Sequence, residues 1–149
     1  MSAADDFKAI MIADTTLMDT LTGGVYTPDD VGPDGITRDT KPAFDEDGFL
    51  MPCALVRERS NVPVRSVSDD ELQLQAVDVV VEIYNYEDGQ YGEINTAQAR
   101  QFTLFQGKSV GGSLPVTLIN VTPHIRDDGP LGGASLQRQD WLVPLLLGV

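Results

Sequence analysis

The segment from Leu72 to Tyr86, which reads LQLQAVDVVVEIYNY, constrains the fold more than any other part of the chain. Successive side chains of a strand point to opposite faces, so its alternation predicts a long strand with one buried face. The buried face carries Val77, Val79, Val81 and Ile83, and the other carries Asp78, Glu82, Tyr84 and Tyr86. Because Leu72, Leu74 and Ala76 have the opposite parity, we expect a bulge or the start of the strand at about residues 75–77.

The rest of the chain predicts further strands and two helices. Helical spacing of apolar residues indicates helices over about residues 4–22 and from Tyr91 to Phe105, the second with Tyr91, Ile94, Ala97, Phe102, Leu104 and Phe105 on its apolar face. Short apolar runs indicate strands over residues 49–59, 114–125 and 137–146, and residues 60–71 form a polar connection or a projecting hairpin. Residues 27–48 show no period and are expected to form a long acidic loop. The order favours an α+β fold in one domain over residues 1–149, with a mainly antiparallel sheet, two helices packed on it, long loops and a projecting hairpin.

The charge of the chain excludes several kinds of partner. Ten basic residues against 23 acidic ones give a formal net charge of -13, which disfavours direct binding to nucleic acid or to an anionic membrane surface. No apolar run approaches the roughly 18 residues needed to cross a bilayer, and the acidic N-terminus does not resemble a secretion signal. We therefore expect a soluble protein. A chain with Cys53 as its one cysteine forms no internal disulfide, which fits a reducing cytoplasm.

The residue types needed for catalysis or metal binding are scarce. His124 is the one histidine and lies in a predicted strand, and Cys53 lies in an apolar run, so both are interpreted as packing residues. One histidine and one cysteine are too few ligands for a structural zinc site. The acids at residues 30–34 and 45–48 lack the spacing of a calcium loop, although a loosely bound cation on this segment is an alternative to a solvated acidic loop. The sequence thus predicts no catalytic residue, no cofactor and no metal.

A group of tyrosines and acids around one Asp-Gly pair is open to two interpretations. Tyr84, Tyr86, Glu87, Asp88 and Tyr91 contain the groups of a carbohydrate site or an acid–base site. The other interpretation is a sheet edge and turn whose tyrosines are half-buried or contact a neighbouring subunit, because tyrosine is favoured at interfaces.

Four features taken in order resemble a known family of virus proteins. They are a helix that ends in LTGGVYTP, the proline-led strand MPCALVRE, the long strand AVDVVVEIYNYEDG that runs into a helix, and a final pair of strands. This order resembles the tail terminator or tail completion proteins of long-tailed bacteriophages, the family that is similar to minor tail protein U of phage lambda. The acidic insertion at residues 27–48 and the connection DDGPLGG depart from the family pattern.

The resemblance implies a structural protein of the virion, located at the tail end or neck and assembled in the host cytoplasm. In that family a small α+β domain forms a ring of six copies on the tail tube, stops polymerisation of the tube protein and offers a surface to the head–tail connector. The resemblance implies no cofactor and no turnover. DNA would pass through such a ring without specific binding, which fits the acidity of the chain.

Contacts between subunits are expected from residues 27–48 and from the connection at residues 57–70. The candidate residues are Arg57, Arg59 and Arg65, the acids Asp45 and Asp47, and the tyrosines Tyr84 and Tyr86. The arginines would meet acids of an adjacent subunit, or else they are solvated charges at strand ends. Two other functions stay open at this point: a head–tail connector or stopper protein of the phage neck, and a small acidic ligand-binding domain or hydrolase.

Overall fold

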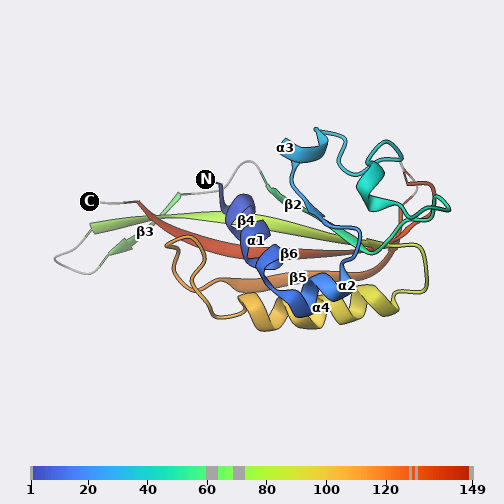
Figure 1. Ribbon diagram of the computed structural model, residues 1–149. Coiled ribbons are helices and arrows are strands. Elements are labelled where there is room, and N and C mark those ends of the chain that lie inside the picture. Colours follow the sequence, from blue (N-terminus) through green and yellow to red (C-terminus); the bar gives the residue numbers. More distant parts are fainter. Residues whose placement is uncertain (1, 60–63, 69–72, 128, 130, 148–149) are drawn as a thin grey trace.

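The chain folds into a twisted sheet with helices on one face (Figure 1). The computed structural model describes residues 2–59, 64–68, 73–127, 129 and 131–147. Hydrogen bonds place the strands in the order β1-β2-β4-β6-β5, with β3 also paired to β4, and β1 with β2 is the one parallel pair among them. The strands are β1 (Val25–Tyr26), β2 (Cys53–Glu58), β3 (Val64–Ser68), β4 (Gln73–Glu87), β5 (Thr117–Arg126) and β6 (Ser135–Leu147). The predicted α+β fold with a mainly antiparallel sheet is confirmed.

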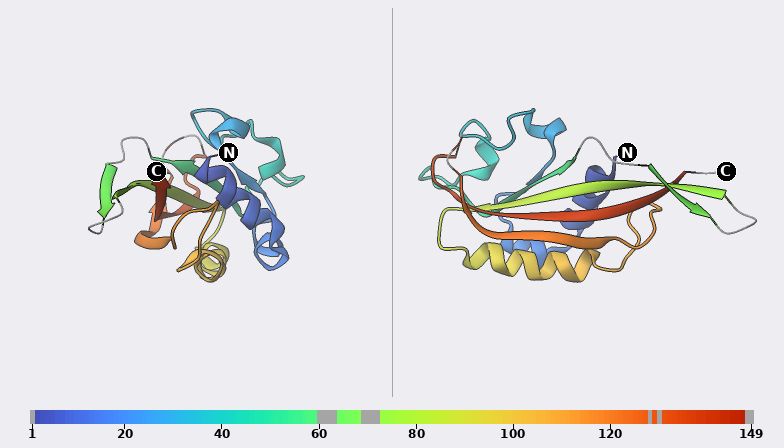
Figure 2. Two further views of the ribbon diagram at one scale, coloured as in Figure 1. Left: turned by 90° about the vertical axis from the view of Figure 1, so that its left-hand side faces the viewer. Right: turned by 180° about the vertical axis from the view of Figure 1, so that it is seen from behind.

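Three helices cover one face of the sheet, which we call the helix face (Figure 2). They are α1 (Ala3–Ala13), α2 (Thr15–Thr20) and α4 (Gly92–Phe105). Beneath them Phe7 stacks on Phe105 with ring centroids 4.3 Å apart, and Trp141 lies edge-on to Phe105 at 5.7 Å. Val81 and Ile83 of β4 are fully buried in the same core, so the alternation in β4 was assigned to the correct faces.

The N-terminal helix differs from its prediction because it breaks at Asp14. The side chain of Asp14 accepts a hydrogen bond from the backbone N–H of Leu17 at 2.9 Å and so caps α2. An aspartate that satisfies a free N–H in this way favours the start of a new helix over continuation of the old one. The predicted helix over residues 4–22 is therefore two helices that meet at Asp14.

An arm of strands extends past the helices (Figure 1). It consists of β3, residues 73–77 of β4 and residues 145–147 of β6, so the hairpin expected after β2 is present. The described part of β4 begins at Gln73 and keeps one register with β6 from Gln75 to Glu87, so of the two alternatives expected at residues 75–77 the bulge is absent. Among the described residues, no helix covers this part of the sheet (Figure 1).

A cluster of buried amides lies between α4 and the sheet. Asn85 of β4 donates to Gln101 of α4 at 2.8 Å and to Gln137 of β6 at 3.2 Å. Gln139 donates to Gln101 at 2.6 Å and accepts from the Trp141 indole at 2.9 Å. The predicted apolar face of α4 was wrong at one position, because Phe102 is 44% exposed and Gln101 is buried in its place. Gln101 tolerates burial because its amide finds amide partners on two strands.

Residues 27–52, which we call the cover segment, lie over one end of the opposite face (Figure 2). The segment contains α3 (Pro28–Val31) and the short 3-10 helix η1 (Lys41–Ala43), and otherwise follows the irregular path that was predicted. Ile36, Ala43 and Leu50 are buried against Leu55 of β2, and Tyr84 and Tyr86 pack at the edge of this second core. Among the described residues, no helix is both long and apolar enough to span a bilayer.

Candidate functional site

Three arginines and two carboxylates occupy neighbouring strands on the face opposite the helices, and we call them the arginine cluster. The register aligns Arg57 of β2 with Glu82 of β4, and Glu82 with Asp140 of β6. Arg59 follows β2, and Arg138 is two residues from Asp140 on the same face of β6. Directly opposed residues lie about 4.5–5.5 Å apart at Cβ, so side chains of opposite charge on three adjacent strands are brought into contact.

The two carboxylates are buried and the three guanidinium groups cover them. Glu82 contacts Arg138 at 2.8 Å, Arg57 at 3.2 Å and Arg59 at 3.6 Å. Asp140 contacts both Arg59 and Arg138 at 3.0 Å. Each carboxylate side chain is 6% exposed, whereas the arginine side chains are 33–44% exposed. Three positive groups against two negative ones leave a surplus positive charge at the surface of a chain with a net charge of -13.

Tyr84 fixes the guanidinium of Arg57 in this cluster. Arg57 donates to the Tyr84 hydroxyl at 2.7 Å and lies over its ring, 4.8 Å from the centroid. The same hydroxyl donates to Glu82 at 3.1 Å. Burial raises the pKa of Tyr84 above its ordinary value although Arg57 acts to lower it, so the hydroxyl stays protonated and keeps its role as a donor.

The structure brings together only some of the residues predicted for a subunit contact. Arg57, Arg59 and Tyr84 meet in the arginine cluster, and the acids that they contact belong to the same chain. The side chain of Arg65 lies outside the described residues, and only its backbone pairing with Ala76 is seen. Whether these arginines also meet a neighbouring subunit stays a prediction. Sequence reasoning missed Arg138 and Asp140, although the alternation in Gln137–Trp141 would have placed both on one face of a strand.

Asp45 and Asp47 lie in a tight turn at the end of the molecule away from β3 (Figure 1), which we call the acidic turn, residues 44–50. Asp45 accepts the backbone N–H groups of Asp47 and Phe49, each at 2.9 Å. Gly48 has φ 82°, a left-handed conformation that glycine adopts without strain. The side chains of Asp45, Glu46 and Asp47 are exposed, and Phe49 is 59% exposed.

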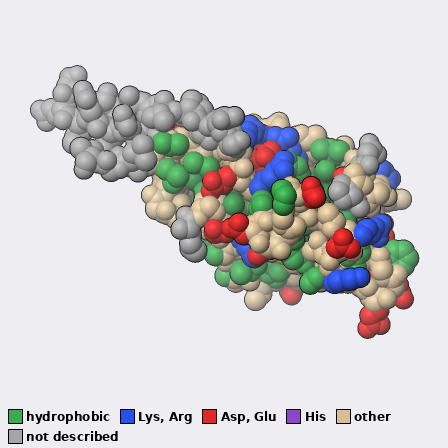
Figure 3. Space-filling model, turned by 90° about the horizontal axis from the view of Figure 1, so that it is seen from above, with side chains coloured by type: hydrophobic (Ala, Val, Ile, Leu, Met, Phe, Trp, Pro, Cys, Tyr) green, Lys and Arg blue, Asp and Glu red, His purple; other side chains and the backbone are tan. Residues whose placement is uncertain are grey.

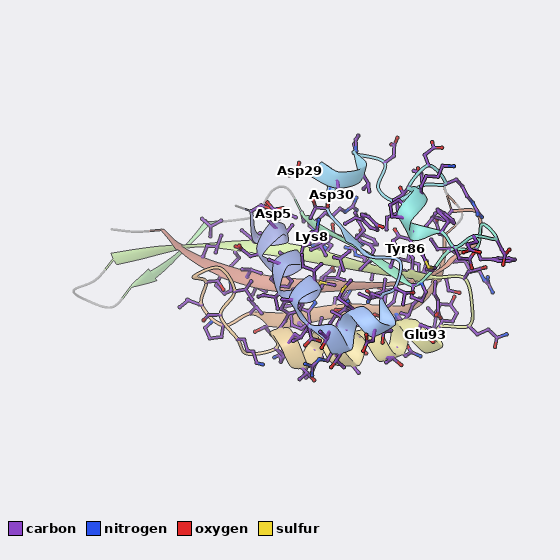
Figure 4. All side chains as sticks on the ribbon, in the orientation of Figure 1. Asp5, Lys8, Asp29, Asp30, Tyr86 and Glu93 are labelled. Atoms are coloured by element: carbon purple, nitrogen blue, oxygen red, sulfur yellow. The ribbon has the colours of Figure 1, made fainter. Side chains whose placement is uncertain are left out.

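The tyrosines and acids of residues 84–91 do not form one site. Tyr84 and Tyr86 stack at 6.4 Å on the face that carries the arginine cluster, and burial raises the pKa of Tyr86. Glu87 instead accepts the backbone N–H of Glu93 at 3.2 Å at the start of α4, where Figure 4 labels Glu93. Tyr91 donates to the carbonyl of Ile125 at 2.9 Å. The turn and the half-buried tyrosines of the structural interpretation are confirmed, but the expected sheet edge is wrong, because β4 is paired with β2 on one side and β6 on the other.

The other groups that could carry chemistry are the Cys53 thiol, the His124 ring and an ion pair in a cleft. Burial raises the pKa of Cys53 to about 12, so its thiol stays protonated, as expected from its apolar neighbours. The His124 ring lies 4.4 Å from the Tyr91 ring. A cleft of about 510 Å³ beside α1 contains the ion pair of Lys8 with Asp30 at 2.6 Å, and both residues are labelled in Figure 4. Within the described ranges, no three His, Cys, Asp or Glu side chains are grouped so that they could hold a metal ion.

Comparison with known proteins identifies a structural relative. No protein-family model and no curated protein sequence matches this chain. Its fold is similar to that of a chain from the virion of a native gene transfer agent (GTA) particle, with a TM-score of 0.58 and 13% sequence identity. The similarity covers 97% of this chain and 94% of the other. The two chains therefore share one fold from end to end, and at this identity the similarity concerns the fold alone.

Proposed function

We propose that the protein is a structural component of a phage-like virion. The observation that carries the proposal is the similarity to a virion chain, which covers 97% of this chain and 94% of the other. The role proposed is assembly and not turnover of a substrate, and the location proposed is the virion after assembly in the host cytoplasm.

Within the virion, we propose a tail terminator: a ring, of six copies in the resembled family, that closes the tail tube and offers a surface to the head–tail connector. The sequence features that resemble this family occupy the core of the fold, in the β1, β2 and β4 strands and the start of α4. A ring of identical subunits needs two different and complementary surfaces on each subunit. The exposed arginine cluster and the exposed acidic turn are two such surfaces of opposite charge.

The charge of the chain supports a ring around the path of DNA. With a net charge of -13, the protein lacks the clustered positive charge that neutralises phosphates and retains a duplex. The arginine cluster does not change this conclusion, because its three guanidinium groups are balanced in part by Glu82 and Asp140.

Electron microscopy of the purified protein tests the proposal. We expect annular particles of one copy number, confirmed by light scattering. When the protein is added to a polymerising tail tube protein, we expect these rings at the tube ends and tubes that stop growing. An unrelated acidic protein of similar size serves as the control.

Three other results would contradict the proposed role. A protein that stays monomeric and leaves tube growth unchanged is not a terminator. Binding to portal-containing heads instead of tube ends would assign it to the neck as a connector or stopper. Substrate turnover lost on changing Tyr84, Glu87 and Tyr91 would assign it to a ligand-binding or enzymatic class.

A further inference from the structure

We propose that the acidic turn of one subunit docks onto the arginine cluster of the next subunit. The inference rests on the proposed ring and names the contact that would build it. It extends the residues expected from sequence by adding Arg138 on one side of the contact and Glu46 and Phe49 on the other. It commits to a second copy of this chain as the partner.

The arginine cluster has hydrogen-bond donors left for a partner. A guanidinium carries five N–H donors. The closest contacts of Arg59 with Glu82 and Asp140 are made by one terminal nitrogen, and its side chain is 41% exposed and so accessible to an incoming carboxylate. Arg57 and Arg59 are 44% and 41% exposed at the side chain, and the buried carboxylates below them hold both groups in place. An acid that arrives here meets fixed donors and the surplus positive charge of the cluster.

The acidic turn presents its side chains in a fixed conformation. Asp45 is used within the turn, where it accepts the N–H groups of Asp47 and Phe49. Glu46 and Asp47 are exposed, and their carboxylates form no hydrogen bond or ion pair with the described residues. A turn that is already ordered loses little conformational entropy when it binds, which favours affinity.

Each of the two surfaces also carries apolar side chains beside its charged groups. Phe49, at 59% exposure, follows the two free acids of the turn. On the receiving face, Val80 and Leu142 oppose each other in the register and are half-buried, two residues away from Glu82 and Asp140 respectively. A phenyl ring that covers this pair would exclude water from the adjacent ion pairs, which strengthens them.

The two surfaces lie at different places on one subunit, as a head-to-tail contact between identical subunits requires. The acidic turn lies at the end of the molecule away from β3 (Figure 1). Positive and negative side chains gather together on the face seen in Figure 3, where the opposite face of the sheet is viewed from above. A contact between two different surfaces repeats from subunit to subunit and closes into a ring when the rotation permits.

Charge reversal of the turn tests the contact. Glu46→Lys with Asp47→Lys should reduce the fraction of protein in rings at least tenfold at a fixed concentration, measured by light scattering and electron microscopy. The matched control is Asp34→Lys with Asp39→Lys, which changes the charge by the same amount at two exposed acids of the same cover segment. The control should form rings like the unchanged protein. Equal thermal unfolding midpoints show that both variants are folded.

Cross-linking tests the proximity directly. Subunits with Asp47→Cys are mixed with subunits with Arg57→Cys and treated with a short bis-maleimide, which spares Cys53 because that thiol is buried. We expect covalent dimers from this mixture and none when Asn95→Cys, on the exposed side of α4, replaces Asp47→Cys. Rings that survive reversal of the turn and give no specific cross-link would overturn the contact and leave the proposed function standing. A protein that forms no ring in its unchanged form would overturn both.

Discussion

Arg100 of α4 holds both carboxylate oxygens of Asp14, the residue between α1 and α2, at 2.8 Å from Nε and 2.7 Å from a terminal nitrogen. This pair connects three helices, because Asp14 also caps α2. The hydrogen bonds from Arg100 hold the pKa of Asp14 below its ordinary value. A carboxyl group with a lowered pKa in the folded state stabilises the fold above the unfolded pKa, and this contribution is lost as the pH falls through the folded pKa.

Replacing Asp14 by alanine should therefore lower the free energy of unfolding in a pH-dependent way. At pH 7 we expect a loss of about 1 kcal/mol from the helix cap alone, with more from the ion pair. The difference from the unchanged protein should shrink as the pH falls below about 3.9, where the carboxyl group of the unfolded chain is protonated. Urea unfolding at pH 7 and pH 3 measures both values. Asp19→Ala, an exposed site in α2, is the control, and a constant difference across this range would contradict the assignment.

Gln101→Ala should destabilise the fold through the buried amide cluster. The change removes one partner of Gln139 and the donor to the Asn85 side-chain carbonyl, and both of these side chains are fully buried. Leaving buried polar groups without partners costs about 1–3 kcal/mol each. Chemical denaturation of the variant should show a loss of at least that size, whereas Asn95→Ala on the exposed side of α4 should stay within about 0.5 kcal/mol. Equal effects of the two substitutions would show that the amides are not coupled.

Phe7→Ala should lower the free energy of unfolding much more than Phe49→Ala. Phe7 has no exposed surface and stacks on Phe105, so its removal leaves a cavity that costs about 3–5 kcal/mol. Phe49→Ala provides a matched control, because the same chemical change at a ring that is 59% exposed should alter stability by about 0.5 kcal/mol or less. Similar unfolding midpoints for the two variants would contradict the position of Phe7 in the core.

Glu87 should make the fold more stable in mild acid than at neutral pH. One of its carboxylate oxygens is buried without a hydrogen-bond partner, and burial raises the pKa of the group. A raised folded pKa gives a contribution that is present below the unfolded pKa of about 4.3 and is lost as the pH rises through the folded value. The unchanged protein should therefore gain stability relative to Glu87→Gln between pH 7 and pH 4. Asp34→Asn, at an exposed site outside the proposed contact, should show no such trend, and a change of the opposite sign would refute the interpretation.

Local patterns in the sequence identify the faces of elements but not their partners. Alternation assigned Val81 and Ile83 to the core and Glu82 to the other face because a strand has a fixed period of two. The contact of Glu82 with Arg138 depends on the register between two strands more than 50 residues apart, and no local pattern specifies that register. Gln101 was missed for the same reason, since its partners come from β4 and β6 and a search for apolar periodicity passes over a buried amide.

The cover segment shows a different limit of the sequence. A few separated residues, Ile36, Ala43 and Leu50, are buried and attach it to the sheet, and such spacing has no period to detect. Its helix α3 depends on local features, Pro28 at the first position and a capping box between Thr27 and Asp30, that a search for apolar periodicity does not use. The candidate arginines were found because they are close in sequence, whereas the acids that bind them come from other strands.

The buried amides also determine how far the arm extends. Asn85 and Gln137 are paired in the register of β4 and β6, and the arm begins eight residues away at the pair of Val77 and Leu145. A slip of two residues, the smallest that keeps every side chain on its own face, would displace one strand by roughly 7 Å and separate the amides from their partners. The polar groups at one end of the sheet thus help to fix the register, and with it the length of β4 and β6 that extends into the arm at the other end.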